Sequence, residues 1–271
     1  MPELLSHYDE VCALVGDDEF AHRILSHYRP PPLPSGCTQA VWLGKDGPAL
    51  IRNYDFPLEI VSDRFEATRW SGREVIAKAQ RPWGGCLDGM NQDGLVASLT
   101  AGGSSVQGPG FSVILMLRYI LETCRTVAEA IAMLSRIPIA LAQNVTVLDR
   151  SGDYGTLFLR PDREPAFSKE LACTNHQDRT SGPADASRCS RERQRAALDA
   201  LDAPAMTLEE LTSRFLTPPI YSRRAKSPTV YSALYRPEEL RADYFWPGHA
   251  RVQRIGTFGN GEYTHDFGVL G

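Results

Sequence analysis

Residues 35–55 read Ser-Gly-Cys-Thr-Gln-Ala-Val-Trp-Leu-Gly-Lys-Asp-Gly-Pro-Ala-Leu-Ile-Arg-Asn-Tyr-Asp, and both the fold and the function depend on this stretch. Two apolar runs, residues 38–43 and 49–54, flank the tetrapeptide Gly-Lys-Asp-Gly at 44–47. An Asp-Gly pair between apolar runs predicts a β-hairpin. The stretch therefore predicts two antiparallel strands, the first beginning at a cysteine.

That cysteine, Cys37, directly follows the small residue Gly36. A chain cut between them would begin with Cys37, which would then carry a thiol nucleophile and an α-amine that takes its proton. The pKa of an α-amine is near ~8, so part of it is neutral at physiological pH. In self-cleavage the thiol would attack the Gly36 carbonyl and form a thioester that water hydrolyses. A Gly-Cys pair alone is not specific, and an ordinary core thiol is the alternative.

The residues before Cys37 favour a detachable leader. Residues 3–28 carry apolar side chains at roughly helical spacing and predict one or two helices. Residues 29–36 read Arg-Pro-Pro-Pro-Leu-Pro-Ser-Gly, which excludes a helix or a central strand. We expect a leader with a proline-rich linker at 1–36 and a body at 37–271. A plain loop between a helix and a strand is the alternative.

The body alternates between strand and helix patterns. Tight glycine turns between the strands indicate antiparallel pairing, and helices packed outside sheets are the simplest layering. No dinucleotide-binding or phosphate-loop motif occurs. Beyond the hairpin, strands are expected at 66–70, 75–79, 95–100, 145–148, 154–159, 171–175, 231–235, 242–246 and 252–258, and helices at 112–137, 187–202 and 207–216.

Composition limits the classes of function. The 271 residues are 42% hydrophobic and 23% charged, as in a soluble globular protein. The net charge of −4 gives no reason to expect nucleic acid or an anionic membrane as partner. No signal peptide or membrane span is apparent, so we expect a cytoplasmic protein. The six cysteines form no CxxC pair, so free thiols are expected and neither metal nor cofactor. Oligomeric state stays open.

Four further residues have side chains suited to the chemistry of a cysteine nucleophile. Arg52 and Asp55 lie on the strand paired with Cys37: the carboxylate would orient the new α-ammonium, and the guanidinium would hold the thiolate or the carboxylate. A structural Arg–Asp pair is the alternative. Asn175 ends an apolar run, where its amide would donate to an oxyanion or cap a turn. His176 is a second candidate base, ranked below the α-amine.

These residues form an ordered set of motifs: Gly36-Cys37-Thr38, then Arg-Asn-x-Asp at 52–55, Gly-Met-Asn-x-x-Gly-Leu-x-x-Ser-Leu-Thr-x-Gly-Gly at 89–103, and Thr-Asn-His at 174–176. From Cys37 to the C-terminus the set resembles the N-terminal-nucleophile hydrolases. The most similar group is the self-cleaving acyl-CoA:6-aminopenicillanic acid acyltransferase-like family, and the choloylglycine hydrolases are its relatives. Each motif alone is unspecific, whereas their combination and order are specific.

The resemblance implies an α+β fold of the αββα type, with two stacked antiparallel sheets flanked by helices. It also implies self-cleavage between Gly36 and Cys37. By motif, Cys37 is the nucleophile and its amine the base, Arg52 and Asp55 orient that end, and Asn175 donates to the oxyanion. Choloylglycine hydrolases have a further oxyanion asparagine where this chain has Ala101. The backbone N–H of Ala101 or Gly102 is therefore expected to take its place.

We expect a self-processing cysteine hydrolase or acyltransferase that acts on linear amides of small molecules through a Cys37 thioester. One alternative is a CoA-dependent N-acyltransferase that holds the anionic CoA on Arg223, Arg224 and Lys226, the one clustered basic run. An amine acceptor would replace water in an acyl transfer. Another alternative is a non-catalytic small-molecule binding protein on the same fold. Residues 56–63 and 215–221 are expected to form the pocket walls.

Overall fold

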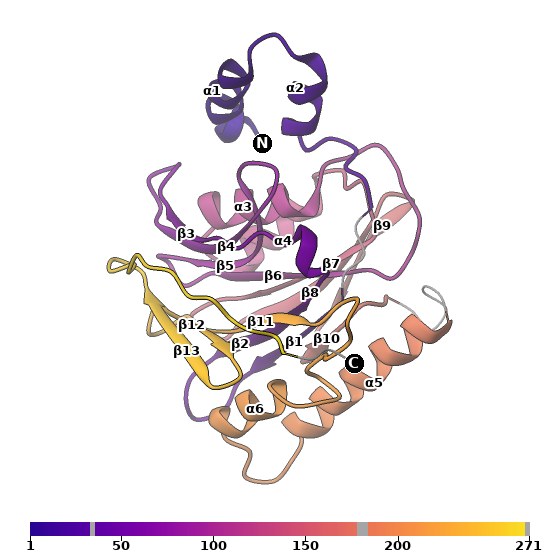
Figure 1. Ribbon diagram of the computed structural model, residues 1–271, viewed down its shortest axis with the longest axis vertical. Coiled ribbons are helices and arrows are strands. Elements are labelled where there is room, and N and C mark those ends of the chain that lie inside the picture. Colours follow the sequence, from indigo (N-terminus) through magenta and orange to yellow (C-terminus); the bar gives the residue numbers. More distant parts are fainter. Residues whose placement is uncertain (33–35, 178–183, 269–271) are drawn as a thin grey trace.

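The computed structural model describes residues 1–32, 36–177 and 184–268, and the side chains of 184–188 also lie outside the description. Two antiparallel sheets lie face to face between layers of helices (Figure 1). Helices α3 (Val113–Thr123) and α4 (Val127–Leu134) cover the seven-stranded sheet. Helices α5 (Ala184–Leu201) and α6 (Leu208–Phe215) cover the six-stranded one. The predicted αββα fold is confirmed.

The six-stranded sheet contains the hairpin predicted from residues 35–55. In that hairpin Cys37 lies opposite Tyr54 and Gly36 opposite Asp55. The sheet order is β10-β1-β2-β11-β12-β13, with β1 at Gly36–Trp42, β2 at Ala49–Asp55, β10 at Ala172–Cys173, β11 at Thr229–Arg236, β12 at Arg241–Trp246 and β13 at His249–Arg254. The last strand therefore ends before 258, the expected end.

The seven-stranded sheet runs in sequence order and includes two strands, β5 and β9, that the sequence did not predict. Its strands are β3 at Phe65–Thr68, β4 at Val75–Gln80, β5 at Gly85–Asn91, β6 at Val96–Ala101, β7 at Gln143–Leu148, β8 at Tyr154–Arg160 and β9 at Arg163–Ser168. Strand β5 lies inside the sheet, between β4 and β6. It is rich in glycine because α3 packs directly on it. A Cβ on Gly85 would lie 2.7 Å from the side chain of Ile114, and one on Gly89 would lie 2.9 Å from that of Leu121.

The predicted helix over 112–137 is wrong, because the segment forms α3 and α4. Cys124 between them has extended backbone angles, φ −100° and ψ 153°. Thr126 caps the second helix by accepting the Glu129 N–H, and Asp149 accepts the Val127 N–H at 3.0 Å. Local capping thus restarts the helix where apolar spacing alone continues. The predicted capping box of α6, Thr207 with Glu210, is confirmed.

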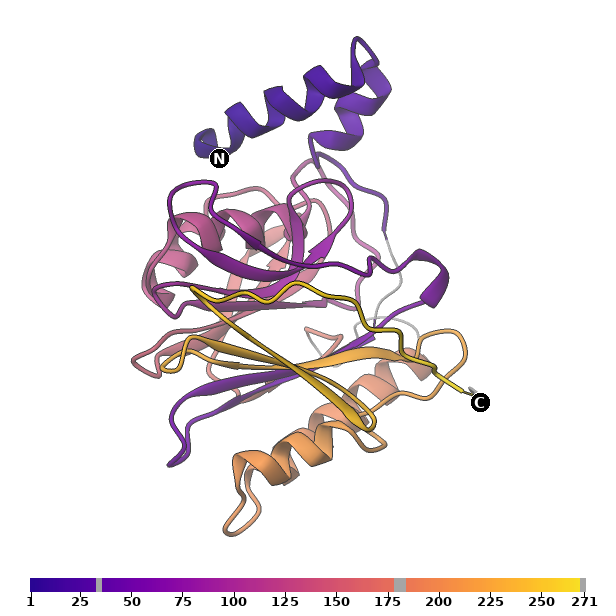
Figure 2. The ribbon, with the colours of Figure 1, turned by 60° about the vertical axis from the view of Figure 1, so that its left-hand side comes forward.

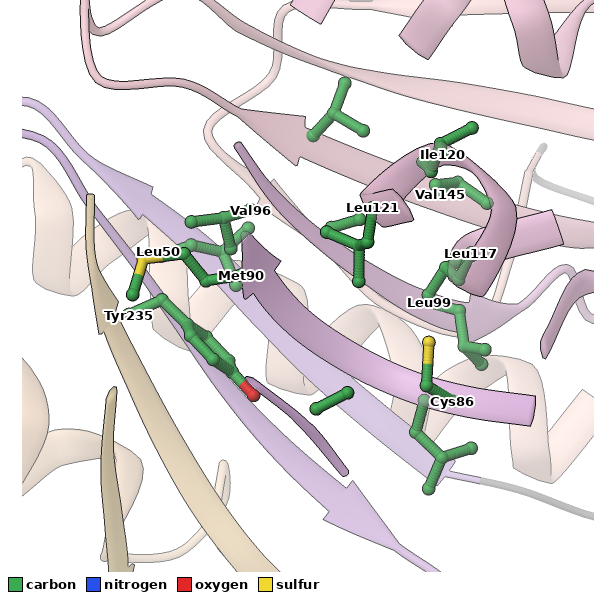
Figure 3. Packing of buried hydrophobic residues seen from close by; sticks show 14 of the residues in the cluster. Leu50, Cys86, Met90, Val96, Leu99, Leu117, Ile120, Leu121, Val145 and Tyr235 are labelled. Atoms are coloured by element: carbon green, nitrogen blue, oxygen red, sulfur yellow. The ribbon is translucent and has the colours of Figure 1, made fainter. Parts of the chain in front are cut away.

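The core lies between the sheets and continues up to α3. Along β1 the side chains alternate: Cys37 and Val41 join the inter-sheet cluster, whereas Ala40 and Trp42 pack in a second cluster with α5 and α6. Figure 3 shows part of the first cluster, in which Leu50 and Tyr235 of one sheet lie beside Met90 and Val96 of the other. Burying one such aliphatic side chain stabilises the fold by about 1.5–3 kcal/mol. Cys37, near the start of β1, therefore belongs to the core between the sheets.

Residues 1–32, which we call the N-terminal segment, lie over the α3 side of the molecule (Figures 1 and 2). They contain a short 3-10 turn at Pro2–Leu4, α1 at Leu5–Val15 and α2 at Glu19–Leu25. Backbone groups join the segment to the body: the Trp83 indole donates to the Leu25 carbonyl at 2.8 Å, and the Ser112 N–H donates to the His27 carbonyl at 2.8 Å. Within the described ranges, no helix combines the length and apolar character of a membrane span.

Candidate active site

The thiol of Cys37 lies at the start of β1 and is completely buried. Arg52, on the paired strand β2, donates from Nη2 to Sγ at 3.2 Å. Burial raises the pKa of the Cys37 thiol to about 11, although the Arg52 charge acts in the opposite direction. In the uncut chain the thiol is therefore protonated at neutral pH, and deprotonation needs a base.

Arg52 is itself held by Asp88, a residue that the sequence analysis missed. Its Nη1 donates to Asp88 Oδ2 at 2.7 Å and to the Leu87 carbonyl at 2.9 Å. The hydroxyls of Tyr231 and Tyr235 also donate to the Asp88 carboxylate. The side chains of this group, those of Arg52, Asp88, Tyr231 and Tyr235, are fully buried. Leu87 takes part only through its backbone carbonyl. Two roles were expected for Arg52, holding the thiol or holding a carboxylate. In the structure its guanidinium donates to the thiol, and the carboxylate that it also contacts belongs to Asp88 rather than Asp55.

The Asp55 carboxylate lies beside the peptide bond expected to be cut. Oδ1 accepts the Thr229 hydroxyl at 2.7 Å, whereas Oδ2 is buried and has no hydrogen-bond partner among the described residues. A Cβ on Gly36 would be 3.1 Å from that oxygen, so glycine permits the close approach. Burial raises the pKa of the Asp55 carboxyl to about 6, and the charge of Arg193 opposes the rise. Asp55 can thus change protonation near neutral pH.

Asn175 follows β10 and faces the backbone of Cys37. Its Oδ1 accepts the Cys37 N–H at 2.7 Å and Nη2 of Arg193 at 2.7 Å. Because both partners are donors, they fix the amide with its oxygen toward them. Nδ2 is then buried without a partner in the described part of the chain. Arg193, on α5, also donates to the Cys37 carbonyl at 3.3 Å and was not anticipated from the sequence.

Other predicted residues have different positions. The Gly102 N–H donates to the Ala142 carbonyl at 2.9 Å, so the expectation that Gly102 offers a free N–H is wrong. Ala101 ends β6 opposite Gln143. His176 Nδ1 lies 2.8 Å from the Ser190 hydroxyl on α5. In the basic run, Arg224 is exposed and its charge lowers the pKa of Asp55, against the effect of burial.

A cavity of about 1140 Å³ lies between the end of β2 and the N-terminal segment. Its lining includes Tyr54, the cross-strand neighbour of Cys37, together with Phe56, Leu87 and Leu99. Directly opposed residues on antiparallel strands have neighbouring side chains, so the cavity comes close to Cys37, although Cys37 is not part of its lining. The N-terminal segment contributes Leu25, His27, Tyr28, Pro30 and Pro31, among others.

The predicted pocket walls are confirmed in part. Phe56, Ser62 and Asp63, from the predicted range 56–63, line the cavity. The range 215–221 contributes differently, because Asn53 Nδ2 donates to the carbonyls of Phe215 at 2.7 Å and Ile220 at 3.2 Å. That range therefore supports β2 from the side of α6.

The family model described as acyl-coenzyme A:6-aminopenicillanic acid acyl-transferase matches residues 42–251. The chain belongs to this family. The match covers most of both sheets, the helices that flank them, and Arg52, Asp55, Asp88, Asn175 and Arg193. It begins at the last residue of β1 and so leaves out Gly36 and Cys37. No curated protein matches the chain.

Two solved structures have a similar fold. Penicillin V acylase from Agrobacterium tumefaciens is 17% identical with a TM-score of 0.54, over 80% of this chain and 84% of that one. A mutant of conjugated bile acid hydrolase from Clostridium perfringens is 13% identical with a TM-score of 0.59, over 85% of this chain and 97% of that one. At such low identity the likeness supports the fold, and family membership supports an enzyme of the amide hydrolase or acyltransferase kind.

Proposed function

We propose that this member of the acyltransferase family is a self-activating cysteine enzyme that cleaves linear amides through a Cys37 thioester. One observation carries the proposal: Arg52, Asp55 and Asn175 converge on Cys37 and on the peptide bond before it. A merely structural cysteine needs no buried guanidinium on its sulfur and no unpartnered carboxylate beside its backbone. Reactive cysteines occupy electropositive surroundings of this kind.

Activation would begin with attack of Cys37 Sγ on the Gly36 carbonyl carbon. The C–N bond then breaks, the Cys37 nitrogen takes a proton and becomes an amine, and water hydrolyses the Gly36 thioester to a carboxylate. The products are a leader of residues 1–36 and a body of 37–271. The new ammonium group would give Asp55 Oδ2, unpartnered within the described part of the uncut chain, an ion-pair partner.

In turnover the free α-amine would take the thiol proton as Sγ attacks the substrate carbonyl. Asn175 Nδ2, buried and without a partner in the described structure, would donate to the oxyanion. One such donor contributes about 10²–10³ in rate. The leaving amine takes the proton back, and water or an amine acceptor resolves the thioester. The apolar inner lining of the cavity, Phe56, Leu87 and Leu99, favours an apolar acyl group next to the scissile bond.

A panel of N-acyl amides with acyl chains of increasing length tests this function. Turnover should rise with chain length, and added hydroxylamine should divert product to the acyl hydroxamate, because it intercepts a thioester. Acyl-CoA thioesters belong in the same panel, since Arg224 near Asp55 is the observation that favours CoA as acyl donor. Saturable binding without turnover of any member would contradict the proposal and support the non-catalytic alternative.

The pKa of Asp55 predicts how stability changes with pH in the uncut chain. The folded pKa of about 6 exceeds the ordinary 3.8, so between these values the folded protein holds a proton that the unfolded chain has released. This stabilising contribution is complete below about pH 4 and is lost as the pH rises through 6. We expect Cys37→Ala to lose about 3 kcal/mol of unfolding free energy over that range relative to Cys37→Ala/Asp55→Asn, measured by denaturant titration. A constant difference between the two proteins would contradict the assigned pKa.

A further inference from the structure

Four polar residues that line the cavity each have a buried polar atom without a hydrogen-bond partner in the described part of the chain. The four atoms are His27 Nδ1, Tyr54 Oη, Gln80 Oε1 and Gln143 Oε1. Buried polar groups are normally hydrogen-bonded, and each one left unsatisfied costs about 1–3 kcal/mol. All four side chains belong to the lining of one cavity, so rotation of each toward the cavity would let a polar group of a bound ligand supply its missing partner.

Arginines surround the outer part of the same cavity. Arg23 and Arg29 belong to the N-terminal segment, whereas Arg64 precedes the edge strand β3 and Arg81 follows β4. All four are exposed, and within the described ranges none has a side-chain hydrogen bond or ion pair. The outer lining also includes the acids Asp63 and Glu66, of which Glu66 is already paired with Arg118. The chain as a whole has a net charge of −4, so these four arginines form a local concentration of positive charge around the cavity.

We infer that the cavity binds an amphipathic anion, with its apolar body against Phe56, Leu87 and Leu99 and its head group at these four arginines. A guanidinium fork matches a carboxylate or phosphate with two parallel hydrogen bonds. A polar group along the ligand would reach Tyr54 Oη or Gln143 Oε1. The inference rests on the proposed function in one respect: as a substrate, this ligand is an acyl amide with an anionic group remote from the scissile bond.

The head-group site is divided between two parts of the chain. Two arginines lie before the expected cut and two after it, so a bound anion would contact both fragments. Because a ligand that binds the assembled form stabilises it by mass action, the anion would also hold the leader on the body after cleavage.

Binding to full-length Cys37→Ala tests the inference independently of activation and turnover. The probes are dodecanoate, monododecyl phosphate and 1-dodecanol, with the two anions below their micellar concentrations and the alcohol below its solubility limit. Binding is followed by calorimetry and by tryptophan fluorescence, since Trp83 lines the cavity. We expect one saturable site that binds at least one of the two anions tenfold or more tighter than the alcohol. The preference should weaken with salt. Which anion binds tighter identifies the head group.

Charge-removing variants locate the head group. Arg64→Gln/Arg81→Gln and Arg23→Gln/Arg29→Gln should each reduce the preference severalfold, and the quadruple variant should bind anion and alcohol equally. Arg125→Gln, an exposed arginine that does not line the cavity, is the matched control and should keep the preference. Equal binding of anions and alcohol by the parent protein, no saturable binding at all, or a preference that survives in the quadruple variant would each overturn the inference, whether or not the wild type cleaves amides.

Discussion

Purified wild-type protein is expected to consist of two fragments, residues 1–36 and 37–271, whereas Cys37→Ala remains one chain. Intact mass spectrometry under denaturing conditions distinguishes the two outcomes directly. The expected effect is complete, because alanine has no nucleophile to attack the Gly36 carbonyl. Amide cleavage should disappear with it, since the free α-amine of residue 37 never forms.

Cys124→Ala is the matched control for that experiment. Cys124 is also a buried, free thiol, but it lies after α3, away from Gly36 and Asp55. This variant should be cut as the wild type is. A wild type that turns over amides while staying intact would contradict activation by cleavage, and a Cys37→Ala protein that is still cut would assign the scission to another protease.

Asp88→Asn is expected to lower the free energy of unfolding by about 3–5 kcal/mol, because it leaves the buried charge of Arg52 without its counterion. Total stability of a domain is only about 5–15 kcal/mol, so the loss is a large fraction of it. Denaturant titration in the Cys37→Ala background measures the effect on single chains. In the background that retains Cys37, self-cleavage should slow by roughly tenfold or more, as a loosely held Arg52 stabilises the thiolate less.

Two further variants separate effects on stability from effects on self-cleavage. Tyr231→Phe removes one hydroxyl from Asp88 but keeps the ion pair, so it should cost only about 1 kcal/mol. Arg52→Met/Asp88→Leu replaces the buried pair by apolar side chains and should recover part of the stability lost in Asp88→Asn. Recovery is incomplete because the Tyr231 and Tyr235 hydroxyls lose their acceptor. Self-cleavage of this double variant should stay slow, because Sγ no longer has a cationic neighbour. Wild-type cleavage in a stable Arg52→Met/Asp88→Leu protein would show that Arg52 has no role in the chemistry.

The elements predicted correctly are those whose signals are local. The hairpin of β1 and β2 follows from an Asp-Gly turn between apolar runs, and α6 follows from its capping box. Strand β5 was missed because its glycines resemble a loop until α3 is packed against them. The break between α3 and α4 has a local signal that was overlooked, the Thr126 cap with Glu129, and a distant contribution from Asp149, which accepts the Val127 N–H. Tertiary contacts of this kind leave no mark in a short window of sequence.

The same distinction applies to the site. Cys37, Arg52 and Asp55 lie on one hairpin, so pairing alone brings them together, and the resemblance to a family supplied Asn175. Asp88 and Arg193 were missed because the first reaches Arg52 from the opposite sheet and the second reaches Cys37 from α5. The expectation that Gly102 donates to an oxyanion failed because its N–H already serves Ala142. Periodicity identifies which face a residue occupies, but it does not identify the partner across the core.

The N-terminal segment contributes part of the cavity wall, although it precedes the bond that we expect to be cut. Once that bond is broken, this part of the cavity wall and Cys37 would belong to two separate polypeptides that are held together only by noncovalent contacts. A body produced directly from residue 37 onward could then be combined with leaders made separately. Each pairing would test how the wall shapes substrate preference with the nucleophile unchanged. Substrate selectivity could then be changed by combining one body with different leaders.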